Sequence, residues 1–447
     1  MFTHTLWRQH GSQWERPPSS METVHNSMSV GLRDGDAAHW IIACGLQFTF
    51  RGTDDEDRLT ARLQRAWAEL RSRFPTLAAT FEEDKVVYKP PLSDEEREAW
   101  VQETFRVHPG RNSNEVFEKA VKTPYIHLHY FPEARYLVLQ GTHNHLDGRG
   151  CFYFFDALFC ALTNPKDVRL GDEVRNLPPT EDQLLGASVP PSTRQIQIYQ
   201  DIVDSLVVEN PIGMPVRADG PPGPNLRREL HLQPGVSSAI SSRCKARGVT
   251  VTLAWHAAVI LATLKIQRRA LGDQAGTNWS SFTNFDLRRY FPGDFDPRQN
   301  VVSTYSTGFP FNVERPMELG FDALAKHLHH AYQTALDDEK LRGLFAYPKP
   351  LLEFFAKHTA PSSTPVLSSI GIVERFLHRE YGSEWVVDDV WIGNSMLSPE
   401  IETFLWRWRD EITLSGSCNL SYYDKKDVDR FLHEVRQELL TGLGISV

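Results

Sequence analysis

The sequence lacks the features of several classes of protein. Its five cysteines are scattered and include no Cys-x-x-Cys pair of the kind that binds zinc or forms a redox couple. No stretch approaches the ~18 consecutive apolar residues that a membrane span needs. The N-terminus has no cationic start followed by an apolar run, so we expect no secretory signal. We therefore expect buried thiols in a reducing compartment, at Cys44, Cys151, Cys160, Cys244 and Cys418.

An excess of positive charge is also lacking. The formal net charge is -9, so the molecule as a whole should repel nucleic acid and anionic lipid. With 41% hydrophobic residues the composition is that of an ordinary globular protein, and 447 residues are enough for two or three sizeable cores. We expect a cytoplasmic monomer with no nucleic-acid or membrane partner.

The chain contains strands and helices in both halves, with a break between them. Proline and glycine make up eight of the seventeen residues from 209 to 225, which is typical of a linker. We therefore expect an N-terminal subdomain over 1–208, a linker over 209–225 and a C-terminal subdomain over 226–447. Periodicity predicts helices over 56–74, from about 150, over 236–247 and over 250–267, an edge strand over 83–91, a strand over 226–232, and paired strands over 125–130 and 135–141.

The decapeptide Gly141 to Gly150, "GTHNHLDGRG", directly follows a predicted strand and precedes a predicted helix. His143 and Asp147 are four residues apart across a tight turn, where we expect Gly148 to adopt backbone angles closed to other residues. A general base needs a fixed ring and a defined tautomer, which such a turn can provide. The pattern alone leaves a second interpretation open, in which His143 ends the strand and Asp147 caps the helix.

Longer stretches of the chain resemble a known family. "THNHLDG" is similar to the His-His-x-x-x-Asp-Gly motif of the chloramphenicol-acetyltransferase superfamily, with Thr142 in place of the first histidine. "NFDLRRYFPG" is similar to the strand whose arginine, here Arg288, pairs with the motif aspartate. Residues 367–374 and 414–440 resemble the late strands and closing helix. The likeness is greatest to the fungal trichothecene 15-O-acetyltransferase group, and the Asp-Phe-Gly-Trp-Gly element of plant members is missing.

The resemblance implies an α/β fold of two chloramphenicol-acetyltransferase-like subdomains, with mixed sheets flanked by helices and a central active-site tunnel. It also implies an O-acyltransferase of fungal secondary metabolism in which His143 is the general base. Acetyl-CoA or another acyl-CoA would be the co-substrate, with no metal and no acyl-enzyme. The acceptor would be a hydroxyl of a small terpenoid or polyketide. Asp147 and Gly148 would hold the turn, with Asp147 paired to Arg288.

Further side chains are candidates for contact with substrate. His145 would share a face with His143 on an extended segment, although a structural role is the alternative. Ser368 or Ser369 could donate a hydrogen bond to a tetrahedral oxyanion. No metal site is expected at the three histidines of a polar helix, which lack a carboxylate at suitable spacing: His327, His329 and His330.

Two other functions are compatible with the same fold. One is a condensation-like enzyme that takes its acyl group from a carrier protein, and the other is a cyclase or pericyclase. A binding module without catalysis is disfavoured, because Asp147 and Arg288 are present alongside His143.

Overall fold

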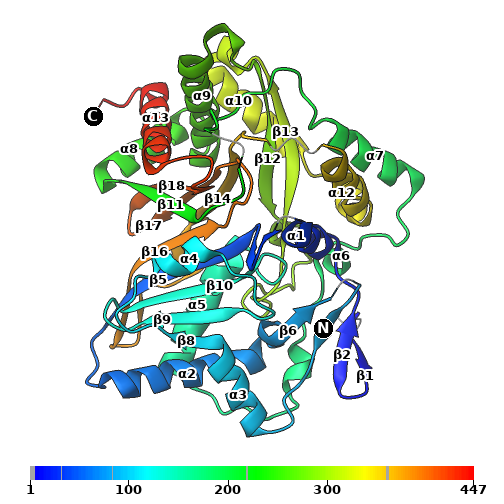
Figure 1. The fold of residues 1–447 in the computed structure, drawn as a ribbon, viewed down its shortest axis with the longest axis vertical. Helices are drawn as coiled ribbons and strands as arrows, with labels where there is room; N and C mark the ends of the chain where they lie inside the picture. Colours follow the sequence, from blue (N-terminus) through cyan, green and yellow to red (C-terminus); the bar gives the residue numbers. More distant parts are fainter. Residues whose placement is uncertain (1–5, 32, 83, 218–219, 359–361, 447) are drawn as a thin grey trace.

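Two six-stranded sheets, one above the other in Figure 1, form the frame of the molecule. The computed structural model describes residues 6–31, 33–82, 84–217, 220–358 and 362–446. The first sheet has the order β15-β16-β5-β10-β9-β8 and the second β11-β18-β17-β14-β12-β13. Both mix parallel and antiparallel pairs and are flanked by helices. The predicted fold class is confirmed.

The first sheet contains β5 (Ile41–Phe50), β8 (Phe105–Val107), β9 (His127–Phe131), β10 (Tyr136–Thr142), β15 (Glu380–Tyr381) and β16 (Trp385–Asn394). The predicted pairing of two strands around residues 125–141 is confirmed by β9 and β10. The apolar strand β5 pairs with β10 on one side and with β16 on the other. A strand from the second half of the chain thus extends the sheet of the first half. Helices α2 (Glu56–Arg73) and α5 (Gly148–Thr163) pack together against the core of this half.

A smaller sheet lies beside the first and corrects one prediction. It has the order β1-β2-β7-β6 and consists of β1 (Arg8–His10), β2 (Gln13–Arg16), β6 (Ala79–Phe81) and β7 (Val86–Tyr88). The edge strand predicted over 83–91 corresponds to β7. Residue 83 of that range lies outside the described residues. β7 is an interior strand, because β2 and β6 both pair with it. The Pro90-Pro91 pair marks only where pairing ends.

The second sheet contains β11 (Asn225–Leu232), β12 (Asn278–Asp286), β13 (Ser306–Glu314), β14 (Val366–Ile372), β17 (Glu402–Trp408) and β18 (Glu411–Asn419). Helix α9 (Val251–Leu271) is buried along most of its length and contacts α8 (Pro234–Ala246), α10 (Pro316–Thr334) and α13 (Lys425–Leu443). The helices predicted over 236–247 and 250–267 are therefore confirmed as α8 and α9.

Shorter elements connect these layers. They are α1 (Ser20–Gly31), α3 (Asp94–Thr104), α4 (Asn114–Lys119), α6 (Glu181–Leu184), α7 (Thr193–Asp204), α11 (Asp338–Arg342), α12 (Pro348–Lys357), β3 (Arg33–Asp34), β4 (Ala37–Ala38) and the 3-10 turns η1 (Pro75–Ala78), η2 (Glu173–Asn176), η3 (Gly272–Gln274), η4 (Leu287–Tyr290), η5 (Leu344–Ala346) and η6 (Val373–Arg375).

The expected linker contains no named helix or strand before β11 begins at its last residue, and residues 218–219 lie outside the described residues. Four of the five thiols are buried as expected, but Cys160 is exposed on α5.

Within the described ranges, no single helix is long and apolar enough to cross a membrane. The adjacent helices α8 and α9 have sufficient length and apolar content only when they are taken together, and they are bent by 101° relative to each other.

Candidate active site

The turn between β10 and α5 carries the motif predicted from the sequence. β10 ends at Thr142 and α5 begins at Gly148. The carboxylate of Asp147 accepts a hydrogen bond of 2.8 Å from the backbone N–H of Gly150 and so caps the helix. The capping role considered for Asp147 is therefore real, and it is combined with a second role.

That second role is an ion pair between Asp147 and Arg288, which lie 3.0 Å apart and are both buried. The predicted pair is thus confirmed, but Arg288 lies in the turn η4 after β12 and not on the strand itself. Asp286, the last residue of β12, binds the same guanidinium at 3.0 Å. Burial alone would lower the pKa of Arg288, but the two carboxylates outweigh it and raise this pKa above its ordinary value.

Asp147 also accepts a hydrogen bond of 2.7 Å from the backbone N–H of Tyr305, which joins the turn to the chain just before β13. Its oxygens are therefore occupied by Gly150, Tyr305 and Arg288. The aspartate holds the turn and connects the two sheets, and it does not hydrogen-bond to His143 in the described chain.

The backbone of His143 is fixed from two sides. Its N–H donates to the carbonyl of Trp40 at 3.2 Å, and its own carbonyl accepts from the Thr304 hydroxyl at 2.6 Å. Burial lowers the pKa of His143 below its ordinary value, and the backbone carbonyl of the same residue and the charge of Asp147 oppose that shift. The ring is therefore neutral at pH 7 and able to accept a proton.

A second histidine, His25 of α1, lies against the first. The two ring centroids are 4.3 Å apart with an interplanar angle of 40°, and Trp40 contacts His25 edge-on at 5.7 Å. Burial and the neighbouring His143 lower the pKa of His25 well below its ordinary value. Both imidazoles are thus neutral, which removes the repulsion that two charged rings would suffer at this distance.

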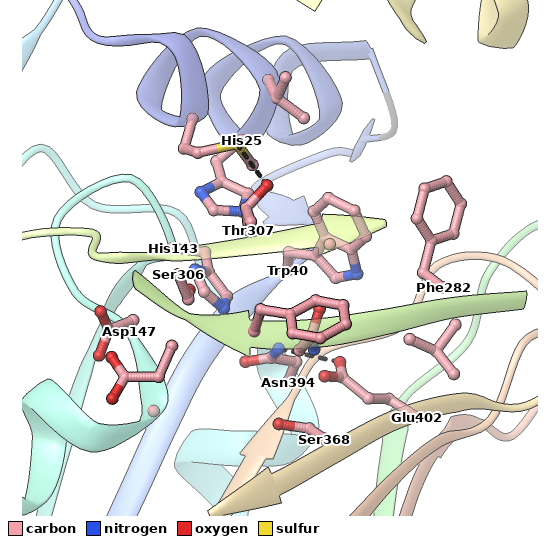
Figure 2. Close-up of a pocket in the computed structure, with 18 of the residues that line it drawn as sticks. His25, Trp40, His143, Asp147, Phe282, Ser306, Thr307, Ser368, Asn394 and Glu402 are labelled. Carbon is pink, nitrogen blue, oxygen red and sulfur yellow. Dashed lines mark hydrogen bonds between the residues drawn. The ribbon is translucent and has the colours of Figure 1, made fainter. Parts of the chain in front are cut away.

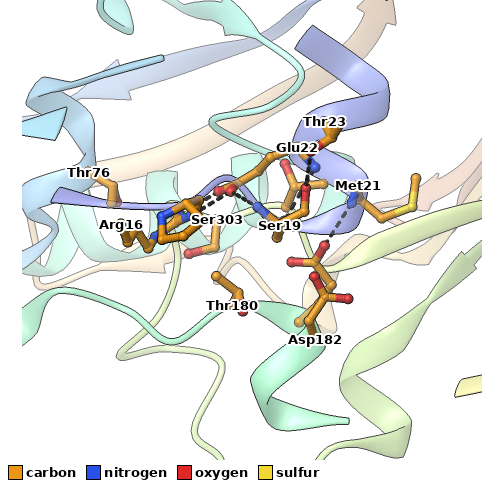
Figure 3. Close-up of polar contacts among 12 residues, drawn as sticks. Arg16, Ser19, Met21, Glu22, Thr23, Thr76, Thr180, Asp182 and Ser303 are labelled. Carbon is orange, nitrogen blue, oxygen red and sulfur yellow. Dashed lines mark hydrogen bonds and ion pairs between the residues drawn. The ribbon is translucent and has the colours of Figure 1, made fainter. Parts of the chain in front are cut away.

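The helix that carries His25 is fixed at its start by carboxylates, as Figure 3 shows. Arg16 forms a double hydrogen bond of 2.6 Å to Glu22 in the first turn of α1. The backbone N–H of Ser20 donates to Asp182 of α6 at 2.7 Å. Negative groups at a helix N-terminus satisfy its free N–H groups. These contacts position α1, and with it His25, over the motif turn.

His143 opens onto a cavity between the two sheets, where about 1000 Å³ of space, part of it open to solvent, is free of protein atoms. Figure 2 shows Asp147 to one side of His143, and Phe282 and Glu402 to the other. The apolar wall consists of Met21, Val24, Trp40, Phe282, Phe285, Tyr347, Leu351, Phe355, Val366 and Ile370. The polar wall consists of His25, His143, Asp147, Arg149, Asn284, Asp286, Arg288, Ser306, Thr307, Ser368, Ser369, Asn394 and Glu402.

The remaining predicted residues fall into two groups. Ser368 and Ser369 of β14 line the cavity. The Ser369 hydroxyl is hydrogen-bonded to the Thr252 hydroxyl at 2.8 Å. His145 is not among the lining residues. Its Nδ1 lies 2.7 Å from the Thr142 hydroxyl and its Nε2 lies 3.1 Å from the carbonyl of Ala79. With both ring nitrogens engaged inside the protein, the geometry favours the structural role considered for His145 over the substrate contact.

Gly148 is needed for a reason other than the one expected. It does not have a positive φ. A Cβ added at this position would lie 2.9 Å from Cδ1 of Ile370 in the second sheet, so glycine permits a close approach of the two halves. The backbone conformation expected for Gly148 is therefore wrong, and the close approach of Ile370 was not expected from the sequence.

Four polar or aromatic lining residues were not predicted from the sequence: His25, Trp40, Asn394 and Glu402. They come from α1, from the residue before β5 and from the ends of β16 and β17, and none belongs to a short motif. Only the burial of polar side chains could have pointed to Asn394 and Glu402, and burial follows from the tertiary fold.

Comparisons with known proteins bear on the fold and on the class of the relatives. No protein-family model matches the sequence. The O-acetyltransferase pigM of Monascus ruber is 24% identical over 445 residues, covering 95% of this chain and 85% of that protein. Acetyltransferase pigO of the same organism is 24% identical over 449 residues, covering 97% and 96%.

The TRI3 trichothecene 15-O-acetyltransferase of Fusarium sporotrichioides superposes with a TM-score of 0.84 at 18% identity, covering 98% of this chain and 97% of that one. The chain has the chloramphenicol-acetyltransferase-like fold. The first condensation domain of the calcium-dependent antibiotic synthetase shares it more distantly, with a TM-score of 0.67 at 14% identity and 96% of each chain covered. The predicted resemblance is confirmed, and the named relatives belong to the predicted class of acetyltransferases.

Proposed function

We propose that this chain is an O-acyltransferase that moves an acetyl or other small acyl group from CoA to a hydroxyl of a hydrophobic small molecule. The observation that carries the proposal is His143, a neutral imidazole held by its backbone at the wall of the cavity between the two sheets. The names of the acetyltransferase relatives support the reaction class.

The proposed reaction needs no covalent enzyme intermediate. Nδ1 of His143 is buried without a hydrogen-bond partner in the described part of the chain, so Nε2 is the proposed base. Nε2 takes the proton of the acceptor hydroxyl, and the oxygen attacks the thioester carbonyl. When the tetrahedral intermediate collapses, the C–S bond breaks and the imidazolium returns its proton to the thiolate.

The two serines of β14 are the proposed donors to the oxyanion of that intermediate. Ser368 and Ser369 line the same cavity as His143. A hydroxyl aimed at the developing negative charge would stabilise the transition state more than the ground state. Ser368 is the stronger candidate, because the Ser369 hydroxyl is already paired with Thr252.

The cavity wall favours a polycyclic acceptor. Aromatic and aliphatic side chains from α1, β12, β14 and α12 surround the space next to His143. Apolar lining with a few polar groups is typical of sites for largely hydrophobic ligands. A terpenoid or polyketide alcohol is therefore the proposed acceptor class.

Release of CoA thiol from acetyl-CoA, measured across a panel of polycyclic alcohols, tests the proposal. We expect thiol release together with a product heavier by one acetyl group. A carrier-dependent enzyme would turn over only an acyl group presented on a carrier protein, and a cyclase would rearrange one substrate without a donor. Either of those results, with no detectable CoA binding, would overturn the proposal.

A further inference from the structure

A carboxyl and an amide lie together in the cavity, on the side away from Asp147 (Figure 2). Glu402 is the first residue of β17 and Asn394 is the last of β16, so the pair joins the two large sheets. Each is only 3% exposed. Nδ2 of Asn394 donates to Oε2 of Glu402 at 2.9 Å.

Among the residues that the structure describes, no cationic side chain neutralises this carboxyl group. Glu402 forms no ion pair with a described residue, and its strand neighbours across the ladder are Val366 and Ser417. A buried carboxylate without a cation is costly, so such a group holds its proton instead. Burial raises the pKa of Glu402 to about 8; the hydrogen bond from Asn394 opposes this shift and the charge of Glu400 adds to it.

The hydrogen bond from Asn394 determines which oxygen carries the proton. Because Oε2 accepts from the amide, the proton of the neutral acid belongs on Oε1. Oε1 has no hydrogen-bond partner within the described part of the chain, and Oδ1 of Asn394 is also buried without a partner. The protein therefore leaves an unused hydroxyl donor at the cavity wall, next to its ladder neighbour Val366 and on the same side of His143 as Phe282.

We propose that Glu402, oriented by Asn394, is a specificity-determining donor that binds a ketone, lactone or ether oxygen of the acceptor at a distance from the hydroxyl undergoing acylation. This inference rests on the proposed function and adds to it a second point of recognition. Two fixed points in one cavity, His143 and Glu402, would select which hydroxyl of a polyoxygenated molecule reaches the base.

The test compares two acceptors, a polycyclic keto-alcohol and the same alcohol without the ketone. Glu402→Gln retains a donor of similar shape, whereas Glu402→Leu removes it. We expect Glu402→Leu to raise KM for the keto-alcohol by a factor of about 10 or more, with little change in kcat and little change for the deoxy acceptor. Glu402→Gln should restore most of the lost affinity.

The wild-type protein should also bind the keto-alcohol less tightly above about pH 8, where Glu402 ionises, and Glu402→Gln should lack this dependence. Glu400→Gln is the matched control. Glu400 has a raised pKa of about 7 from burial and accepts a hydrogen bond from Ser398, but it does not line the cavity. We expect no change in KM for either acceptor in that variant.

The inference and the proposed function fail in different ways. An unchanged KM in Glu402→Leu, or an equal rise for both acceptors, would overturn the inference while leaving CoA-dependent acylation intact. If the wild type acylates neither acceptor, Kd values of the two alcohols, measured by quenching of tryptophan fluorescence, take the place of KM. A preference for the keto-alcohol that Glu402→Leu abolishes would then support the subsite, and equal Kd values would refute it.

Discussion

The imidazole of His143 is positioned by backbone contacts and not by a carboxylate. All the hydrogen bonds of Asp147 go to Gly150, Tyr305 and Arg288, so the aspartate acts on the histidine only through the shape of the turn and through its charge. At the residue scale the motif therefore separates into a base and a structural anchor, and the two make different predictions.

For the base, we expect His143→Ala to lower turnover by a factor on the order of 10²–10⁴, the usual contribution of a positioned general base. Thermal stability and acetyl-CoA binding should remain close to wild type, because the side chain makes no hydrogen bond to another described residue through Nδ1. His330→Ala, on the exposed face of α10, is the control and should keep full turnover. Near wild-type turnover of the His143 variant would contradict the assignment.

The buried acid Glu402 predicts a dependence of stability on pH. Its pKa is raised from 4.5 to about 8 in the folded chain, so the folded state keeps a proton that the unfolded chain releases. The free energy of unfolding should therefore fall as pH rises from about 4.5 to about 8. Urea unfolding across this range should show a smaller fall for Glu402→Gln. Parallel profiles for the two proteins would show that Glu402 is already ionised at neutral pH.

At the scale of elements, the start of α5 is joined to the second sheet by the pair of Asp147 and Arg288. Asp147→Asn and Arg288→Ala should each cost up to ~3–5 kcal/mol of stability, because breaking a buried pair leaves the remaining charge less well compensated. Arg288 would keep only Asp286 as its partner, and Asp147 would keep only its two backbone N–H donors. The double variant should lose less than the sum of the two single losses. Chemical denaturation of all four proteins measures this coupling, and strict additivity would show that the contact is absent.

The pairing of β5 with β16 depends on a glycine. A Cβ added at Gly45 would lie 1.9 Å from Nε1 of Trp391 on β16, and the guanidinium of Arg227 from the second sheet lies 3.9 Å from the same ring. Gly45→Ala should therefore destabilise the protein by ~1–3 kcal/mol or more through overpacking. Gly293→Ala, where the added Cβ meets nothing within 4 Å, is the control. Equal melting temperatures of the two variants would contradict this account.

Elements held together by local pattern were predictable, and those that depend on distant partners were not. The succession of β9, β10 and α5 follows from alternation, turn residues and an apolar run within forty residues. The interior position of β7 depends on β2, about seventy residues earlier in the chain, and no local signal reports it. The site shows the same contrast. A local motif predicted His143, whereas no local pattern indicated that His25 or Glu402 would line the cavity.

At the scale of the whole molecule, the cavity lies where the two halves meet. His143 comes from the first half of the chain, and Arg288 and Ser368 come from the second. We propose that residues 209–225 separate two subdomains, over 1–208 and 226–447. One exchange crosses this division, because β15 and β16 from the second half of the chain belong to the sheet of the first half. Asn394 at the end of β16 reaches the cavity because of this exchange.

The exchange predicts that residues 1–208 do not fold alone. Without β16, the ten-residue strand β5 would lose its partner on one side, and a long apolar strand with a free edge favours aggregation. We expect the isolated fragment to show no cooperative thermal transition and a weak near-ultraviolet tryptophan signal. Co-expression with residues 226–447 should restore both, since the second fragment supplies β15 and β16. A cooperative transition of the first fragment by itself would show that β5 and β10 form a stable sheet before the C-terminal strand is added, and that the two halves fold independently.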